Sequence, residues 1–149
     1  MDVIVIDRED ARRAQVRALV ECAGGAVAAY GDPGDFGARA RWAPLYLVAD
    51  EARALVATTI LLTRFEKPAY IVAYGDEPAI QDVIGALSMG ASDYITWPFG
   101  AHTIRNRLQT ARAREASARR SVDWRAGEAE RGKMRRLLEA MAKRLRRVA

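Results

Sequence analysis

Residues 68–99 read PAYIVAYGDEPAIQDVIGALSMGASDYITWPF, and this stretch decides the fold. Tyr70–Ala73 is a short apolar run of the kind found in buried strands, and Ser92–Thr96 is a second such run. Between them, Ile80–Met89 is a predicted helix that ends at Gly90. A helix that connects two strands is the crossover of a parallel sheet. The stretch therefore predicts part of an α/β protein.

The sequence before this stretch repeats the alternation of apolar runs and helical segments. Ala52–Arg64 fits a helix or a strand by its apolar pattern, and we assign a helix because the neighbouring segments alternate that way. The other expected strands are Val3–Ile6, Ala26–Tyr30 and Pro44–Asp50, and the other expected helices are Arg12–Cys22 and Asp35–Arg41.

Five strands that alternate with helices predict an α/β, flavodoxin-like (βα)5 fold. The sheet is expected to be parallel, with strand order 2-1-3-4-5 and helices on both faces. A chain of 149 residues, half of them hydrophobic, suits one such domain with an appendage. In sheets of this kind, functional groups gather at the carboxyl ends of the central strands.

The composition limits where the protein acts and how it is stabilised. No segment approaches the roughly 18 consecutive apolar residues that a membrane span needs, and the N-terminus is acidic where a signal peptide is basic. We therefore expect a cytoplasmic protein. Cys22 is the single cysteine, which excludes an internal disulfide, and we expect it to be a small core residue.

Charge is distributed unevenly along the chain. Residues 1–100 hold 9 Lys and Arg against 14 Asp and Glu, whereas residues 101–149 hold 15 against 5. This asymmetry predicts a globular module followed by a basic segment with an acidic partner. We place the module at residues 1–117 and a basic amphipathic helical extension at residues 118–149.

From Thr103 onward the sequence predicts helix without further strands. Two apolar stripes follow one another with a break in phase at Ser121–Gly132, so two helices and one helix with a hinge both fit. We expect the first stripe to pack on the sheet. The first stripe is Ile104, Leu108, Ala111, Ala118 and Val122, and the second is Met134, Leu138, Met141, Leu145 and Val148.

The chain resembles a response-regulator receiver domain over residues 2–117. The most specific part of the resemblance is Gly90–Ile95, which reads GASDYI, together with Pro98-Phe99. The opening run that ends at Asp7 adds weaker support. The resemblance implies a signalling module of a two-component phosphorelay system.

The resemblance also assigns roles to individual residues. Asp50 matches the phosphoacceptor, and Asp7 matches one of the paired acids that hold Mg²⁺ together with it. Oxygen ligands of this kind suit a hard divalent cation. Tyr94 matches the switch aromatic, whose rotation accompanies phosphorylation in the family.

Several positions depart from the family pattern. The family's second acid is replaced by Arg8, its strand-end hydroxyl by Ala73, and its phosphate-binding lysine by Trp97. Glu9 fits the vacant metal-ligand role if the loop shifts by one residue. These departures argue against a working Mg²⁺ site and against efficient phosphorylation of Asp50.

Arg8 offers a substitute for the missing groups. Its guanidinium is expected either to pair with Asp7 or Asp50, where it fills the metal and phosphoryl space, or to point into solvent. Trp97 is expected either to be exposed beside Tyr94, as a contact surface for another protein, or to pack locally.

The sequence as a whole predicts an atypical receiver protein that acts through protein contacts. The alternative is a response regulator, phosphorylated at Asp50, that controls transcription through a DNA-binding output region outside this chain. His102 is expected to be a solvated helix residue, and no nucleophile and base are paired in the sequence, so we expect no enzyme. The expected protein partner is a sensor kinase or an output protein.

The basic segment indicates two further partners. Its cations suit contact with DNA phosphates without sequence readout. Its apolar stripe favours a homodimer, and we expect Trp124 to anchor the segment. Because like charges repel across a pair of such helices, the dimer is expected to strengthen when salt screens the charges and to weaken when residues 133–149 are removed.

Overall fold

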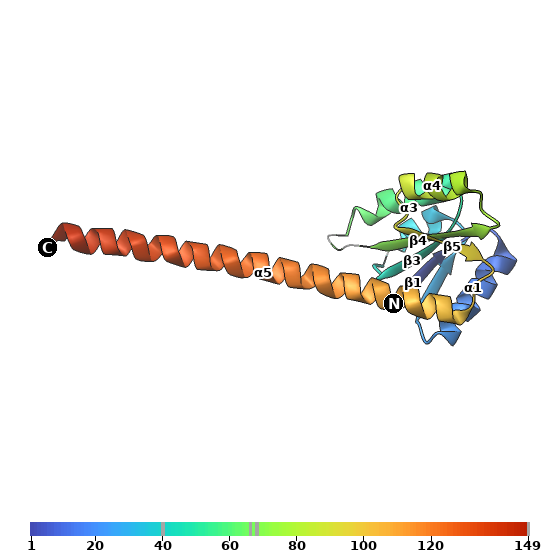
Figure 1. Ribbon diagram of the computed structural model, residues 1–149, viewed down its shortest axis with the longest axis horizontal. Coiled ribbons are helices and arrows are strands. Elements are labelled where there is room, and N and C mark those ends of the chain that lie inside the picture. The colour runs from blue at the N-terminus through green and yellow to red at the C-terminus, as the bar shows by residue number, and fades with distance from the viewer. Residues whose placement is uncertain (40, 66, 68, 149) are drawn as a thin grey trace. The chain divides into compact units, whose positions relative to one another are not determined.

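The computed structural model describes residues 1–39, 41–65, 67 and 69–148, and it divides into two compact units, Met1–Glu115 and Ala116–Ala149. Ala40 of the predicted helix Asp35–Arg41, Pro68 and Ala149 lie outside the described residues, as does the side chain of Val148. Figure 1 shows the elements. The strands are β1 (Val3–Ile6), β2 (Val27–Tyr30), β3 (Leu45–Ala49), β4 (Tyr70–Asp76) and β5 (Asp93–Trp97), and the helices are α1 (Asp10–Cys22), α2 (Pro33–Ala38), α3 (Ala52–Leu62), α4 (Ile80–Ser88) and α5 (Ala101–Val148).

The five strands form one parallel sheet in the order β2-β1-β3-β4-β5. The predicted fold class and strand order are confirmed. The ambiguous segment after β3 is helix α3, as predicted. Cys22 is exposed at the end of α1, so its predicted place in the core is wrong.

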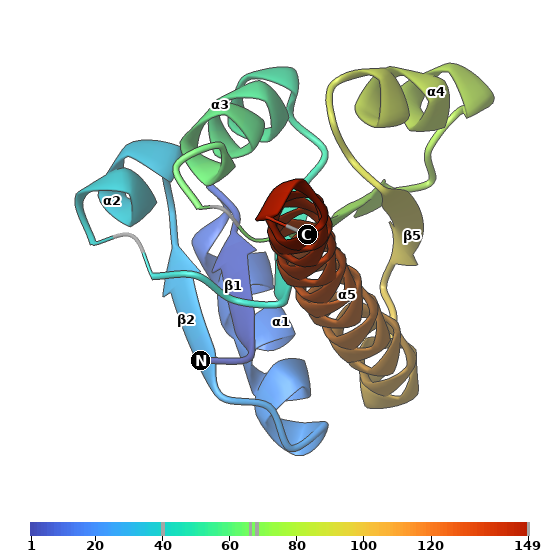
Figure 2. The same cartoon turned by 90° about the vertical axis from the view of Figure 1, so that its left-hand side faces the viewer.

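Each face of the sheet carries its own core because successive side chains of a strand point to opposite faces. Val3 and Val5 of β1 pack with α1 and the start of α5, whereas Ile4 and Ile6 pack with α2, α3 and α4. Figure 2 shows α2, α3 and α4 along one side of the sheet. Both faces of β3 are buried, which explains why its sequence is continuously apolar.

Strand β4 is longer than predicted. It continues to Asp76, three residues beyond the expected end at Ala73, because β5 pairs with it through Gly75 and Asp76. This difference decides which residue of β4 lies at the functional edge.

Helix α5 is continuous, so the alternative with two helices is wrong. Ile104, Leu108 and Ala111 are buried against the sheet, as predicted for the first stripe, but Val122 is 64% exposed. Trp124 is also exposed, and among the described residues its ring stacks on no other aromatic ring. Within the described residues, no helix combines the length and apolarity needed to cross a bilayer.

Candidate functional site

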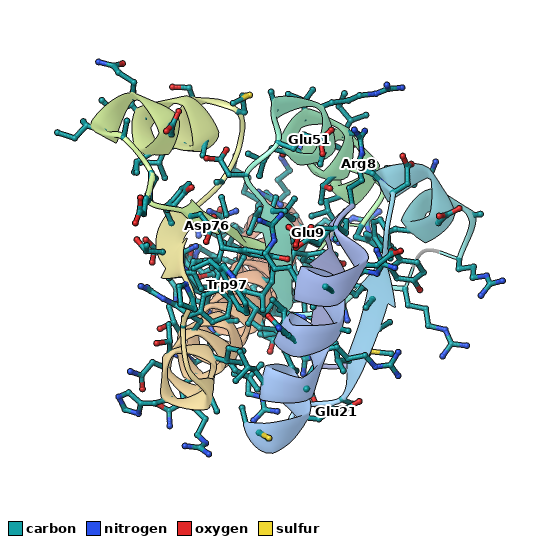
Figure 3. All side chains as sticks on the ribbon, turned by 90° about the vertical axis from the view of Figure 1, so that its right-hand side faces the viewer. Arg8, Glu9, Glu21, Glu51, Asp76 and Trp97 are labelled. Carbon is teal, nitrogen blue, oxygen red and sulfur yellow. The ribbon has the colours of Figure 1, made fainter. Side chains whose placement is uncertain are left out.

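The candidate site lies at the carboxyl edge of the sheet. Asp7 follows β1 and Asp50 follows β3, and Figure 3 shows Glu9, Glu51, Asp76 and Trp97 at the same edge. In the register of the sheet, Ala49 lies opposite Tyr74. The backbone N–H of Asp50 then donates a hydrogen bond to the Tyr74 carbonyl at 2.7 Å, which holds Asp50 beside the end of β4.

Asp7 is buried, and its carboxylate is held by four hydrogen bonds. Arg12, in the first turn of α1, donates from Nε to Oδ2 at 2.6 Å and from Nη2 to Oδ1 at 2.9 Å. The Tyr74 hydroxyl donates to Oδ2 at 2.7 Å, and the Glu9 backbone N–H donates to Oδ1 at 2.9 Å. A carboxylate offers about four acceptor positions. The described contacts therefore use the full acceptor capacity of Asp7.

The electrostatics of this cluster favour an ionised Asp7. Burial acts to raise the pKa of the carboxyl, but hydrogen bonds from Arg12, Tyr74 and the Glu9 N–H outweigh it, and the pKa is lowered. The hydrogen bond to Asp7 raises the pKa of Arg12 despite burial. Burial and the charge of Asp7 raise the pKa of Tyr74. The cluster is therefore a buried ion pair with a neutral tyrosine as a third member.

The guanidinium beside Asp7 belongs to Arg12 and not to Arg8. Arg8 makes an ion pair of 3.0 Å with Glu51, and its side chain is 70% exposed, so its predicted pairing with Asp7 or Asp50 is wrong. Arg8 extends from the loop after β1 toward the start of α3, where Glu51 lies. Glu9, the other predicted metal ligand, lies 3.5 Å from Nη1 of Arg12. Arg12 thus contacts both acids of this loop.

Asp50 is engaged by the predicted switch aromatic. The Tyr94 hydroxyl donates to Asp50 Oδ2 at 2.8 Å, and burial and the Asp50 carboxylate raise the pKa of Tyr94. This contact depends on a glycine in β4. A Cβ at Gly75 would lie 2.5 Å from the Tyr94 hydroxyl and 3.3 Å from the Asp50 Cβ. The missing side chain leaves the space that the hydroxyl occupies.

The strand-end position beside Asp50 is therefore Gly75, and the assignment of that position to Ala73 is wrong. Ala73 is buried in the core with α2, α3 and α4. The error has a physical cause, since β4 runs two residues past Ala73 before it reaches the edge. Neither residue carries the hydroxyl that the receiver resemblance implies.

Trp97 packs locally at the end of β5. Its ring lies 5.0 Å from Phe99 and 6.5 Å from Tyr74, measured between ring centroids. Trp97 packs on the core with α1, whereas Tyr94 packs on the opposite core. The two aromatic residues therefore do not share a face, and the alternative of a joint contact surface is wrong. Tyr74 connects Trp97 to the Asp7 cluster.

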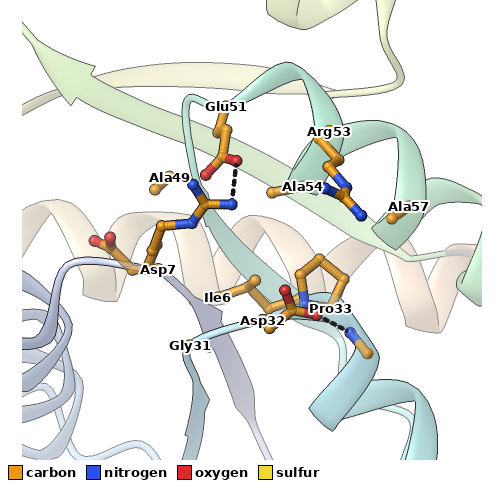
Figure 4. Close-up of a pocket in the computed structure, with 12 residues that line it drawn as sticks. Ile6, Asp7, Gly31, Asp32, Pro33, Ala49, Glu51, Arg53, Ala54 and Ala57 are labelled. Atoms are coloured by element: carbon orange, nitrogen blue, oxygen red, sulfur yellow. Dashed lines mark hydrogen bonds and ion pairs between the residues drawn. The ribbon is translucent and has the colours of Figure 1, made fainter.

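A cavity of about 240 Å³ adjoins the site between the loops after β1 and β2 and the start of α3. Figure 4 shows Glu51 and Arg53 on one side and Gly31–Pro33 on the other. Its charged lining is of both signs, so it favours no strongly charged ligand. The lining residues are Ile6, Asp7, Arg8, Gly31, Asp32, Pro33, Gly34, Ala49, Glu51, Arg53, Ala54 and Ala57.

The site residues do not fit the Mg²⁺ that the resemblance implies. Asp7 is the central ligand of such a site, and all its acceptor positions are used by Arg12, Tyr74 and Glu9 N–H. Among the described residues, no group of three or more His, Cys, Asp or Glu side chains is arranged to hold a metal. A guanidinium provides the positive charge beside Asp7.

No family model matches the sequence, and no curated protein matches it significantly. Solved structures do match. A response regulator receiver domain from Clostridium thermocellum superimposes with a TM-score of 0.65 and 15% identity, over 78% of this chain and 98% of that one. The receiver domain of NtrX from Brucella abortus matches with a TM-score of 0.60 and 19% identity, over 74% and 97%. The chain has the receiver fold.

The same receiver fold occurs in proteins with other descriptions. A putative pilus assembly protein from Burkholderia thailandensis matches with a TM-score of 0.62 and 17% identity, over 76% of this chain and 98% of that one. At these identities the likeness concerns the fold alone. The functional residues must therefore be judged from this chain's own geometry.

Three residues of the site were missed in the sequence: Arg12, Tyr74 and Gly75. Arg12 carried a detectable signal, because a long side chain in the first turn of a helix can reach back to the acid that precedes the helix. Tyr74 and Gly75 required the correct end of β4, which the apolar pattern does not define.

Proposed function

We propose that this protein is an atypical receiver of a two-component system, which signals through protein contacts and does not depend on phosphorylation of Asp50. The receiver fold supports the signalling class. The atypical state is inferred from the site, in which the groups that serve phosphoryl transfer in the family are replaced or engaged.

One observation carries the proposal: the bidentate contact between Arg12 and Asp7. Binding of Mg²⁺ at Asp7 would require Arg12 to leave a buried, hydrogen-bonded partner, and breaking such a pair costs several kcal/mol. The Tyr94 hydroxyl also occupies an oxygen of Asp50. Position 97, where the family carries its lysine, bears an uncharged indole. Attack by Asp50 on a phosphodonor therefore lacks both the metal and the ammonium.

Acetyl phosphate with Mg²⁺ tests the proposal directly. Intact mass spectrometry should show little phosphoryl adduct on the original protein. The matched variant Arg12→Gln removes the charge beside Asp7, and it should bind Mg²⁺ more tightly than the original protein. A rapid, stoichiometric adduct on the original protein that disappears in Asp50→Asn would overturn the proposal.

The alternative is a phosphorylated regulator of transcription with a DNA-binding output region outside this chain. It is favoured by the position of Asp50, which follows β3 at the edge where the family carries its phosphoacceptor. The same mass measurement separates the two functions.

We further propose that the protein self-associates through the distal stripe, defined as the exposed apolar residues Met134, Leu137, Leu138, Met141 and Leu145. These side chains are between 54% and 73% exposed. Burial of each contributes about 1.5–3 kcal/mol, so the stripe favours a partner, and a second copy is the simplest one. Sedimentation of the full chain over a range of concentrations tests this, and a monomer throughout would contradict it.

A further inference from the structure

Helix α4 presents an apolar surface to solvent. Ile80, Ile84 and Leu87 are between 45% and 78% exposed, and they fall within about 60° of one another around the helix axis. We call these three residues the α4 stripe. The buried contact of α4 with the sheet is made by Ala86.

The α4 stripe lies in the most acidic part of the chain. Residues 68–104 contain no Lys or Arg and four acids. Asp76 ends β4 and Glu77 follows it in the loop before α4, and both are exposed. Among the ion pairs between described residues, none involves these two acids. The apolar surface of α4 is thus preceded by two acids without an ion pair, which we call the acidic border of α4.

The distal stripe of α5 has the opposite border. Its five residues fall within about 100° around the helix axis, and Arg135 and Arg144 lie on its two sides. Residues 131–147 hold eight Lys and Arg against the single acid Glu139. The described ion pairs of this segment include only Lys133, which lies 3.5 Å from Glu130.

We propose that the distal stripe of one copy binds the α4 stripe of a second copy, with the basic border of α5 against the acidic border of α4. This inference rests on the proposed self-association and names the surface that the distal stripe covers. The two surfaces are complementary in both respects, because apolar residues meet apolar residues and unpaired acids meet cations.

The charges favour this contact over a pairing of two distal stripes. Two distal stripes would bring together two segments that each carry seven net positive charges, and like charges oppose association. When the distal stripe instead meets α4, its cations lie against the acids of the acidic border, and these opposite charges attract. Higher salt should therefore weaken the dimer, whereas it would strengthen a pairing of two basic stripes.

Substitutions on α4 test the surface. Ile80→Gln with Ile84→Gln in the full chain should raise the dimer dissociation constant at least about tenfold, measured by sedimentation equilibrium. Ile60→Gln on α3 is the matched control, since this isoleucine is 63% exposed but lies on a helix without acids in its sequence. Circular dichroism verifies that each variant is folded.

The possible results distinguish the α4 contact from the proposed self-association on which it rests. A monomer at every concentration removes both. A dimer that is unchanged by the α4 substitutions, or weakened equally by Ile60→Gln, retains self-association and overturns the α4 contact. A dimer that strengthens with salt also overturns it.

Charge reversal provides an independent test. Asp76→Lys with Glu77→Lys should weaken the dimer, as should Arg135→Glu with Arg144→Glu, and the combination of all four should recover association beyond additivity. If the combination does not recover association, the inference is overturned.

Duplex DNA and vesicles of phosphatidylglycerol are the competing occupants. If either binds the full chain through the distal stripe while the α4 variants associate normally, the stripe serves a polyanion and the inference falls.

Discussion

At the carboxyl edge of the sheet, the positive charge beside Asp7 belongs to Arg12 of α1, and β5 ends in the indole of Trp97. Arg12 pairs with the buried Asp7, and Trp97 packs on Tyr74, which hydrogen-bonds the same carboxylate. A buried ion pair that loses one partner leaves an unpaired charge, which is far more costly than the loss of a surface pair.

Arg12→Gln should therefore lower the free energy of unfolding by about 3 kcal/mol, because the Asp7 carboxylate loses its counter-charge while it remains buried. Urea denaturation measures this change. Arg17→Gln is the control, since the Arg17–Glu21 pair is exposed at 3.3 Å and should contribute less than about 1 kcal/mol. Equal effects of the two substitutions would contradict the role of Arg12.

Asp7 should also make stability depend on pH in acid. Its pKa is lowered in the folded protein, so its contribution is present above the ordinary value of 3.8 and is lost as the pH falls through the lower folded value. We expect the stability difference between the original protein and Asp7→Asn to shrink as the pH falls below 3.8. Urea denaturation from pH 7 to pH 2 measures it. A constant difference would show that Asp7 is not ionised in the folded state.

At the scale of elements, the alternation of apolar runs and helical segments was sufficient to predict all five strands and their order. The end of β4 could not be predicted, because Gly75 and Asp76 read as turn residues and join the strand only through pairing with β5. The same limit hid the contact between Tyr94 and Asp50. The pairing of Arg12 with Asp7 was missed because Arg8 and Arg13 are also close to Asp7 in the sequence, and only the structure shows that Arg8 pairs with Glu51 and Arg13 with Asp10.

Gly75→Ala should release Tyr94 from Asp50. The added Cβ would lie 2.5 Å from the present position of the hydroxyl, so the tyrosine must move. Burial and Asp50 raise the pKa of Tyr94, and in the variant this pKa should fall toward 10.0. An ultraviolet titration should then show one more tyrosine that ionises near pH 10 than in the original protein. Gly85→Ala in α4 is the control, since its Cβ meets only Met89 at 3.8 Å. An unchanged titration of Gly75→Ala would mean that Tyr94 does not depend on the glycine.

At the scale of the molecule, the core of the first unit ends well before α5 does. The last buried residue of α5 is Ala111 among the described residues, and the first compact unit ends at Glu115. Residues 116–148 of α5 belong to the second compact unit, and their described side chains are exposed or half-buried. Stability and self-association should therefore be separable.

A chain shortened after Glu115 should keep the thermal midpoint of the first unit within about 2 °C, because it retains every buried contact of that unit. A chain shortened after Asn106 should be destabilised by at least about 3 kcal/mol, since it loses the buried Leu108 and Ala111. Thermal denaturation followed by circular dichroism measures both. If the longer fragment is also strongly destabilised, the distal helix supports the first unit.

The pair of Arg12 and Asp7 has a consequence for control of the protein in the cell. A free ion occupies its site according to its concentration, whereas a guanidinium joined to the backbone is present at a fixed ratio of one per molecule. Chelators, nucleotides that sequester magnesium and changes in ion transport therefore leave this site with the same occupant. Under the proposed function, the contacts that this protein makes with its partners therefore do not depend on the supply of magnesium.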